Sequence, residues 1–512
     1  MKYLLTLGLC TLLLACHSGR EVRSVRLFPV PGAVDVNPDT RLTIEFTATP
    51  VLGDSGKIRI FEAGTGLLVD SLDLSIPAGP TRPAPRVEGA TYTKMPYDYA
   101  RTKIPTNHNT RPGTPSGTAE PTSDTCQLTI IGGFTDGFHF HPVLVQGSRA
   151  VICPHHQMLE RGKRYYVTID KGVLSCAKDR FDGIADPRAW SFTTKAALPA
   201  LRDTLVVSAD GTGDFSTVQG AMDFIPDFTE EPVVVFVRNG DYEELVYFRN
   251  KSNVTLEGES RDGVIIHYAN NEVFNPHPRN VLTNEVPGTF PSRRAAFAMD
   301  NCRDMTLKNL TVMTTLKGQA EGLLVMGERN RFENIHIVGD GDALQVNGSA
   351  YFTGCRLDGG GDAILGRGPA FFYKCELNNG GGPFIWVRNT DANRGNVFVG
   401  CTFRNTAGRT SVLARSPKNS GKYYPYAEAV LIDCRLDGIA PEGWGRIEGD
   451  TRHNRFWEYN SIDAEGRPVD VSRRHPASRQ LTLPGDKEWI EKYRNPEWVL
   501  GWNPEGKPEA NR

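Results

Sequence analysis

The sequence predicts an all-β protein in which a β-sandwich is followed by a parallel β-helix. A short strand-like phrase recurs at intervals of 20 to 33 residues in the C-terminal part, whereas alternating apolar runs without that period occupy the N-terminal part. The 52 glycines and 34 prolines among 512 residues provide the turns that many short strands require. Because the character of the sequence changes near residue 200, we expect a sandwich unit at residues 21–198 and a helical unit at residues 199–512.

Composition and charge exclude several classes of protein. Lys+Arg total 58 and Asp+Glu total 60, so the net charge is −2. No long basic run is present, so we expect no binding to nucleic acid. Hydrophobic residues make up 39% and charged residues 23%, which is typical of a globular rather than a disordered chain. The one long apolar run lies at the extreme N-terminus, which excludes a polytopic membrane protein.

The first residues have the layout of a secretory signal. MKYLLTLGLCTLLLAC contains Lys2, an apolar core too short to span a bilayer, and Ala15 directly before Cys16. Its ending, LLAC, resembles a bacterial lipobox, whose cysteine becomes the lipidated first residue of the mature protein. We expect residues 1–20 to be a signal and tether lipidated at Cys16, unless a plain signal peptide is cut nearby. The protein would then be exported across the inner membrane and anchored by lipid to one face of the outer membrane.

The N-terminal unit is predicted to be a sandwich of short strands. Apolar and polar residues alternate in several runs separated by turn residues, and the opening and closing runs resemble bacterial Ig-like domains found ahead of secreted enzymes. A Pro/Thr/Gly-rich stretch over residues 78–125 is too long for a hairpin loop and is predicted to be an insertion. The predicted strands lie at residues 22–28, 41–47, 57–63, 164–170 and 189–195.

Histidines and cysteines in this unit leave two questions open. His139 and His141 are two residues apart, so on a strand they would share a face and could reach one metal together with residues of the CPHH segment at 153–156. The alternative, a polar strand face and loop histidines, is the one that we adopt, so no metal site is predicted. One disulfide is conceivable here, but the three cysteines are an odd number and the pairing stays open; they are Cys126, Cys153 and Cys176.

The C-terminal unit repeats one phrase, which predicts a parallel β-helix. RFENIHIVG, YFTGCRLDG, FFYKCELNN, VFVGCTFRN and VLIDCRLDG each contain a short alternating strand and a turn. A single coil cannot bury its inner face alone, so coils stack and equivalent residues form ladders along the axis. Cysteines at the central position are therefore predicted to be small buried hydrophobic residues rather than disulfide halves. The predicted ladder is Leu310, Ile335, Cys355, Cys375, Cys401 and Cys434.

Stacking converts sequence spacing into geometry. Asp342 and Asp362 are 20 residues apart and take the same place in consecutive coils, ~4.8 Å apart along the axis. Gln319 precedes Asp342 by 23 residues, again about one coil, and Arg415 follows further along the stack. Adjacent carboxylates divide into acid and base, a guanidinium keeps one of them ionised, and an amide can donate to an oxyanion. This set suits acyl transfer with a carboxylate nucleophile; the alternative is a solvated Asp ladder at glycine-rich turns.

The order and spacing of these motifs resemble the pectin methylesterases. VVSADGTGDFSTVQGAMDFIP at residues 206–226 resembles the first conserved segment of that family, and GQAEGLLV, GDGDAL, GGGDAILG, LAR and FWEYNSIDAEG follow in the family's order. The resemblance spans roughly residues 203–475. It implies a right-handed parallel β-helix and a carboxylic ester hydrolase that releases methanol from methyl-esterified galacturonate units of pectin, with no cofactor and no metal.

Matched residue by residue, the resemblance implies roles for four side chains. Asp362 takes the place of the nucleophile and Asp342 that of the general acid/base. Gln319 corresponds to an oxyanion-stabilising glutamine, and Arg415 to the arginine that holds the nucleophile.

The sequence also departs from the family. Gly341 stands where the family has a second oxyanion glutamine, and loss of one such donor can cost ~10²–10³ in rate. The segment after the nucleophile, residues 363–365, lacks the usual phenylalanine, and Ser416-Pro417 replaces Pro-Trp, so a sugar-stacking tryptophan is absent. The substrate subsite is therefore altered, and a branched or decorated pectin is the predicted substrate. Candidate replacements for the missing ring are Trp386, which we favour for substrate binding, and Trp444 and Trp457.

Two other classes stay open from the sequence. Parallel β-helices also include pectate lyases and polygalacturonases, although a lyase needs Ca²⁺-binding acidic groups and a basic side chain. The departures at Gly341 and Ser416 also allow a catalytically inactive, lipid-tethered pectin-binding module.

Overall fold

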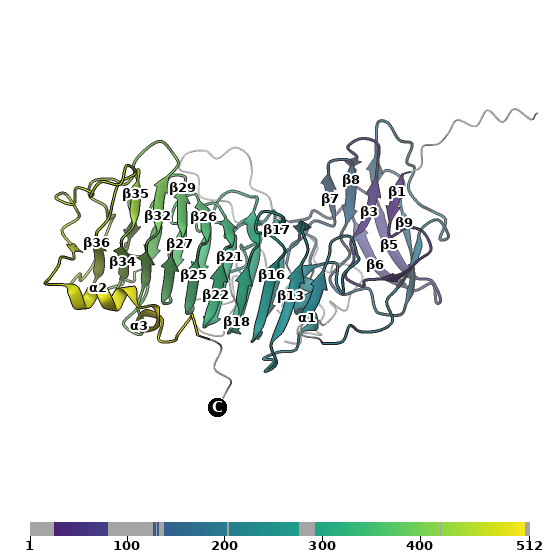
Figure 1. Ribbon diagram of the computed structural model, residues 1–512. Helices are drawn as coiled ribbons and strands as arrows, with labels where there is room; N and C mark the ends of the chain where they lie inside the picture. The colour runs from purple at the N-terminus through teal and green to yellow at the C-terminus, as the bar shows by residue number, and fades with distance from the viewer. Residues whose placement is uncertain are drawn as a thin grey trace, which may run out of the picture.

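A computed structural model describes most of the chain as two β-rich units (Figure 1). The described residues are 25–79, 126–129, 131–132, 138–201, 204–275, 292–419 and 421–506. The signal predicted at residues 1–20, the lipidation site Cys16 and most of the predicted insertion lie outside these ranges, so they stay predictions.

Two sheets form the N-terminal sandwich, whereas its Ig-like character stays a prediction. The first sheet has the order β1 (Arg26–Phe28), β3 (Leu42–Glu45), β8 (Arg149–Ile152), β7 (Val143–Gln146). The second has the order β2 (Ala33–Val36), β11 (Ser191–Thr194), β9 (Arg164–Ile169), β5 (Lys57–Glu62), β6 (Leu68–Asp73). When the strands are lettered in chain order, the first sheet follows the A-B-E-D order of an Ig fold. The second follows G-F-C, with one strand added at each edge. A short pair, β4 (Val51–Leu52) and β10 (Leu174–Ser175), lies beside them.

The alternating strands of the sandwich enclose one apolar core. Ile44 of β3 and Ile58 of β5 come from opposite sheets and are both fully buried in it. Tyr165 of β9 is buried too, and its hydroxyl accepts a hydrogen bond of 2.8 Å from the backbone N–H of Glu160. A tyrosine hydroxyl that contacts the backbone a few residues upstream, near the start of strand F (here β9), is typical of Ig-like domains. Cys153 and Cys176 carry free thiols.

Three parallel sheets form the faces of the β-helix, and each complete coil contributes one strand to each face in turn. Face A has the order β12 (Thr204–Val207), β13 (Val233–Val237), β16 (Val254–Gly258), β19 (Thr306–Lys308), β22 (Asn330–Glu333), β25 (Ala350–Thr353), β28 (Ala370–Tyr373), β31 (Asn396–Val399), β34 (Glu428–Ile432), β36 (Arg455–Tyr459), β37 (Ser478–Gln480). Face B has β14 (Gly240–Glu243), β17 (Val264–Tyr268), β20 (Thr311–Thr314), β23 (His336–Val338), β26 (Arg356–Gly359), β29 (Glu376–Asn379), β32 (Thr402–Asn405), β35 (Arg435–Asp437). Face C has β15 (Val246–Arg249), β18 (Phe297–Arg303), β21 (Leu323–Glu328), β24 (Leu344–Val346), β27 (Ile364–Gly366), β30 (Ile385–Val387), β33 (Ala414–Arg415). The parallel β-helix predicted from the repeats is therefore confirmed.

The predicted inward ladder is confirmed as well. Every member, from Leu310 to Cys434, is buried in the helix core directly before a strand of face B. The cysteines among them are free thiols. A stack of phenylalanines runs beside the ladder, with ring centroids 4.6 Å apart between Phe332 and Phe352 and again between Phe352 and Phe372.

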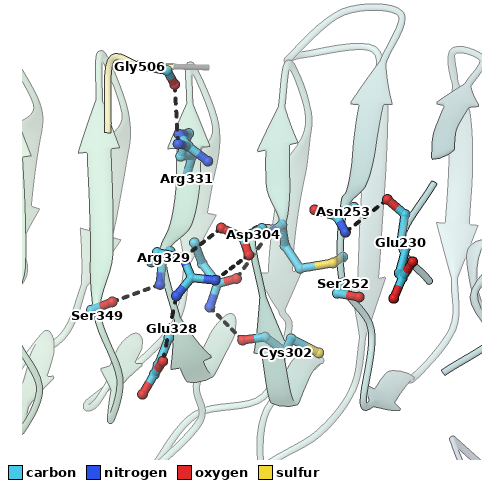
Figure 2. Close-up of polar contacts among 12 residues, drawn as sticks. Glu230, Ser252, Asn253, Cys302, Asp304, Glu328, Arg329, Arg331, Ser349 and Gly506 are labelled. Carbon is cyan, nitrogen blue, oxygen red and sulfur yellow. Dashed lines mark hydrogen bonds and ion pairs between the residues drawn. The ribbon is translucent and has the colours of Figure 1, made fainter. Parts of the chain in front are cut away.

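Polar side chains link successive coils at the turns between faces C and A. Figure 2 shows Arg329 between two carboxylates: Nε donates to Asp304 of the preceding coil at 2.8 Å, and Glu328 lies 4.0 Å away. The backbone N–H of Arg329 donates to the hydroxyl of Ser349 in the following coil at 2.7 Å. The charge of Arg329 is therefore balanced by one carboxylate of its own turn and one of the preceding coil.

The sandwich packs against the first coils and covers part of face C. Asp39 accepts hydrogen bonds from the backbone N–H groups of Ser216 and Thr217, at 2.9 and 2.8 Å, where α1 (Val218–Phe224) begins. Phe138 lies 4.5 Å, ring to ring, from Tyr247 of β15, and both are fully buried in an apolar cluster shared by the two units. The sandwich thus limits how far face C is open.

Two short helices cover the far coils on face A (Figure 1). They are α2 (Lys487–Arg494) and α3 (Pro496–Leu500), and Ile490, Tyr493 and Leu500 pack on face A strands. No helix in the described part of the chain has both the length and the apolar character needed to cross a membrane.

Candidate active site

Three carboxylates form a column at the edge where the strands of face C begin. Leu323 pairs with Leu344, and Leu344 with Ile364, in consecutive coils. The residues two positions before these are Glu321, Asp342 and Asp362, so parallel stacking aligns them. Asp342 and Asp362 were predicted to be neighbours from their spacing, and the structure brings them together.

Both aspartates are presented from left-handed turns. Asp342 has φ 70° and Asp362 has φ 46°, in a region that Asp and Asn tolerate better than most residues. The backbone N–H of Asp342 donates to the carbonyl of Gly361 at 3.1 Å, which ties the two turns together. Residues in such conformations concentrate at functional sites.

Arg415 holds Asp362 through a two-pronged contact. Nε of Arg415 donates to Oδ1 at 2.7 Å, and Nη2 donates to Oδ2. The hydrogen bond to Asp362 raises the pKa of Arg415, despite its partial burial. A bidentate guanidinium–carboxylate contact fixes the plane of the carboxylate as well as its position. Asp362, with 16% of its side chain exposed, is accessible at this edge.

Asp342 lies deeper and is bound by a different arginine. Only 8% of its side chain is exposed, and Nη2 of Arg294 lies 3.2 Å from Oδ2. Burial raises the pKa of Asp342; the charge of Arg294 opposes this shift, and the negative charge of Asp362 adds to it. A carboxyl group that binds its proton more tightly than its neighbour is suited to act as an acid.

Arg294 also orients Gln319. Its Nη1 donates to Oε1 of Gln319 at 2.5 Å. Because a guanidinium only donates, the amide oxygen must face Arg294, and the amide NH₂ is directed elsewhere. Gln319 is exposed, and its backbone N–H donates to Glu272 at 2.8 Å. The Gln319 amide is therefore held by the same guanidinium that contacts Asp342.

Sequence reasoning missed Glu321 and Arg294. Glu321 is fully buried, accepts a hydrogen bond of 2.7 Å from Nε of Arg294, and has its pKa raised to about 7 by burial. It precedes Asp342 by 21 residues, so the coil spacing that selected Asp342 and Asp362 would also have selected Glu321. Arg294 lies 27 residues before Glu321, outside any repeat, so no pattern in the sequence pointed to it.

The structure separates the three tryptophans considered for sugar binding. Trp444 is fully buried in the helix core. Trp457 lies on face A beneath α2, with its ring centroid 5.4 Å from that of Trp489. Trp386 pairs with Arg415 in register on face C, and the guanidinium carbon of Arg415 lies 4.9 Å from its ring centroid. Only Trp386, of these three, borders the carboxylates.

The histidines of the sandwich are engaged separately. Nδ1 of His139 donates to the carbonyl of Phe274 at 2.6 Å, and His141 stacks on the Phe274 ring with centroids 4.8 Å apart. His155 and His156 each contact a different aspartate. Among the described residues, no cluster of three or more His, Cys, Asp or Glu side chains could hold a metal ion.

Comparison with known proteins identifies the family. The sequence model of the pectinesterase family matches residues 204–483. Probable pectinesterase 8 of Arabidopsis thaliana is 25% identical over 293 residues, which cover 54% of this chain and 71% of that protein. Among solved structures, the pectin methylesterase from carrot has 20% identity and a TM-score of 0.48, covering 58% of this chain and 92% of that chain. PemA of Erwinia chrysanthemi has 22% identity and a TM-score of 0.45, covering 59% and 98%.

The protein is a carboxylic ester hydrolase built on a parallel β-helix. Since the family match covers more than half of the chain, the chain belongs to the pectinesterase family.

Proposed function

We propose that this protein hydrolyses methyl esters on galacturonate units of pectin and releases methanol, with Asp362 as nucleophile and Asp342 as general acid and base. The observation that carries the proposal is the contrast between two adjacent carboxylates. Asp362 is bound on both oxygens by Arg415, whereas Asp342 is buried and has a raised pKa. Such a division of environments supports these two roles.

In the first half of the reaction, an oxygen of Asp362 attacks the ester carbonyl carbon. The carbon–methoxy bond breaks as Asp342 gives its proton to the departing oxygen, so methanol leaves and an acid anhydride joins the galacturonate to Asp362. Arg415 keeps the attacking carboxylate in one orientation. The attacking oxygen must be aligned with the ester carbonyl carbon for the reaction to be fast.

In the second half, water attacks the galacturonyl carbon of the anhydride. Asp342, now ionised, takes a proton from that water, and the bond to the Asp362 oxygen breaks. The galacturonic acid is released, Asp342 is protonated again, and Asp362 is again a carboxylate, so all atoms and charges balance.

The oxyanion of both steps is stabilised by the amide of Gln319. Arg294 replaces the function of the side chain missing at Gly341, because it holds the Gln319 amide in place and supplies positive charge beside Asp342. Preorganised donors of this kind cost no reorganisation during the reaction.

The charges of the carboxylate column explain why Asp342 can carry the proton that it needs as an acid. Its three carboxylates are bound by two guanidiniums, those of Arg294 and Arg415. Like charges at this spacing favour retention of one proton. Glu321 and Asp342 are the buried members with raised pKa values, so the retained proton is assigned to this pair.

The altered subsite favours a branched or decorated pectin. Leu365 and Trp386 pair in register on face C beside Arg415, where the family pattern has aromatic residues at other positions. We further propose that lipid on Cys16 holds the enzyme at the outer membrane after export, so that it acts on pectin outside the cytoplasm.

Methanol release tests the proposal directly. The wild-type protein and an Asp362→Ala variant are incubated with highly methylated pectin and with a branched pectic fraction, and methanol is measured. Release by the wild type that disappears in the variant is expected. Comparable release by both proteins would remove Asp362 from the nucleophile role, and no release by a folded wild type would favour a binding module.

A further inference from the structure

A cavity lies where the sandwich packs against the first coils of the β-helix. Its volume is about 630 Å³, within the range of ~300–1,000 Å³ that small-molecule sites occupy. The sandwich contributes residues 38–41 and the CPHH segment at 153–156, and the helical unit contributes part of α1 and residues 244–245. No member of the carboxylate column lines this cavity, so it is separate from the candidate active site.

Apolar side chains make up much of the cavity wall. Phe140 and Leu159 come from the sandwich, Phe215 and Leu245 come from the helical unit, and all four are buried. A ligand of matching shape gains van der Waals contacts with these walls, and its apolar surface leaves water. The walls therefore favour a ligand with an apolar body.

Most of the charged side chains that line the cavity are bound within the protein. Asp39 and Glu244 accept hydrogen bonds from backbone N–H groups at the start of α1, and burial raises the pKa of both carboxyl groups. Asp223 is bound by His156. A guanidinium N–H of Arg161 donates to a backbone carbonyl at 2.8 Å. These groups have partners without a ligand.

Arg41 differs from them. It directly precedes β3, where Leu42 pairs with Ile152, so its side chain lies beside the sulfur of Cys153. Burial raises the pKa of that thiol, which is therefore neutral at neutral pH and does not balance the cation. Glu244 acts on Arg41 only electrostatically, and no carboxylate of the described residues forms an ion pair with it. A partly enclosed cation in this state gains free energy from an anion.

We infer that this cavity is a binding site for a small organic acid with one carboxylate and an apolar body, and that Arg41 holds the carboxylate. The planar fork of a guanidinium matches a carboxylate in geometry as well as charge. Because the walls come from both units, the bound acid stabilises the contact between the sandwich and the β-helix. The inference does not depend on the proposed reaction, since it uses no residue of the carboxylate column.

The test measures binding of a charged probe against its neutral analogue. We choose 3-phenylpropionate and 3-phenylpropionamide, which share a shape, and titrate each by calorimetry into the wild type, Arg41→Gln and Arg188→Gln. Arg188 belongs to the sandwich and has 90% of its side chain exposed, so its variant controls for the loss of one charge. We expect the wild type and the control to bind the acid roughly tenfold or more tightly than the amide, and Arg41→Gln to lose this preference.

Thermal unfolding shows whether each variant is folded, and 3-phenylpropionate is expected to raise the Tm of the wild type. Arg41→Lys, which keeps the charge but not the fork, should bind the acid with intermediate affinity. A folded Arg41→Gln that still prefers the acid would overturn the inference. The wild type alone also decides: equal affinity for acid and amide, no binding of 3-phenylpropionate or octanoate at millimolar concentration, or tighter binding of galacturonate than of 3-phenylpropionate would each refute it.

Discussion

Arg294 offers the sharpest test of the site, because one side chain contacts Gln319, Glu321 and Asp342. Replacement by methionine keeps an unbranched apolar stem and removes the charge and the hydrogen-bond donors of the guanidinium. Two unit charges ~4 Å apart interact by ~4 kcal/mol at an effective dielectric constant of ~20, which corresponds to ~3 pKa units. Since burial and Asp362 already raise the pKa of Asp342 and the charge of Arg294 opposes this shift, Arg294→Met should raise that pKa further.

An Asp342 with a higher pKa can still protonate the departing methoxy oxygen. In the anhydride intermediate it then takes a proton back from solvent at neutral pH, so it cannot accept one from the attacking water. The anhydride on Asp362 should then accumulate in Arg294→Met. We expect a burst of methanol stoichiometric with enzyme, followed by slow turnover whose optimum moves to higher pH. The assay is rapid-quench measurement of methanol over a range of pH, with thermal unfolding to confirm the fold.

Arg294→Lys keeps the charge and should show a smaller shift, which separates electrostatics from loss of packing. Arg404→Met on face B serves as a control for a distant arginine. A pH profile for folded Arg294→Met that superimposes on that of the wild type, with no burst, would refute the reasoning.

Three further outcomes are expected. Glu321→Gln removes a group whose pKa is about 7 in the folded protein, against an ordinary value of 4.5. Because the folded state binds the extra proton, the free energy of unfolding of the wild type falls as pH rises from about 4.5 to about 7. In denaturant titrations the variant should lack up to about 3 kcal/mol of that fall. An equal fall in both proteins would place the proton elsewhere. Trp386→Ala should raise KM roughly tenfold with kcat little changed, and a loss confined to kcat would argue against a binding role. Phe138→Ala should lower the free energy of unfolding by about 3–5 kcal/mol, because Phe138 is fully buried between the two units; a change below about 1 kcal/mol would show that this contact is not maintained in solution.

The repeats were sufficient to predict the helical architecture. Each coil must bury an inner face, so the inward ladder from Leu310 to Cys434 appears in the sequence as a phrase with a near-constant period. The same stacking rule placed Asp342 and Asp362 side by side, and applied strictly it would have added Glu321. In the sandwich, the predicted strands correspond to β1, β3, β5, β9 and β11. Strands β2 and β7, whose residues do not alternate between buried and exposed, were not recognised.

The sequence by itself therefore determined the fold class, the register of the coils and the column of carboxylates, because a parallel stack converts spacing along the chain into position along one axis. Tertiary structure decided how those carboxylates differ. Arg294 comes from a segment without the repeat, and its side chain reaches Glu321 and Asp342 of the coils that follow. Burial likewise depends on what covers each turn, which is why Asp342 is enclosed while Asp362 stays accessible.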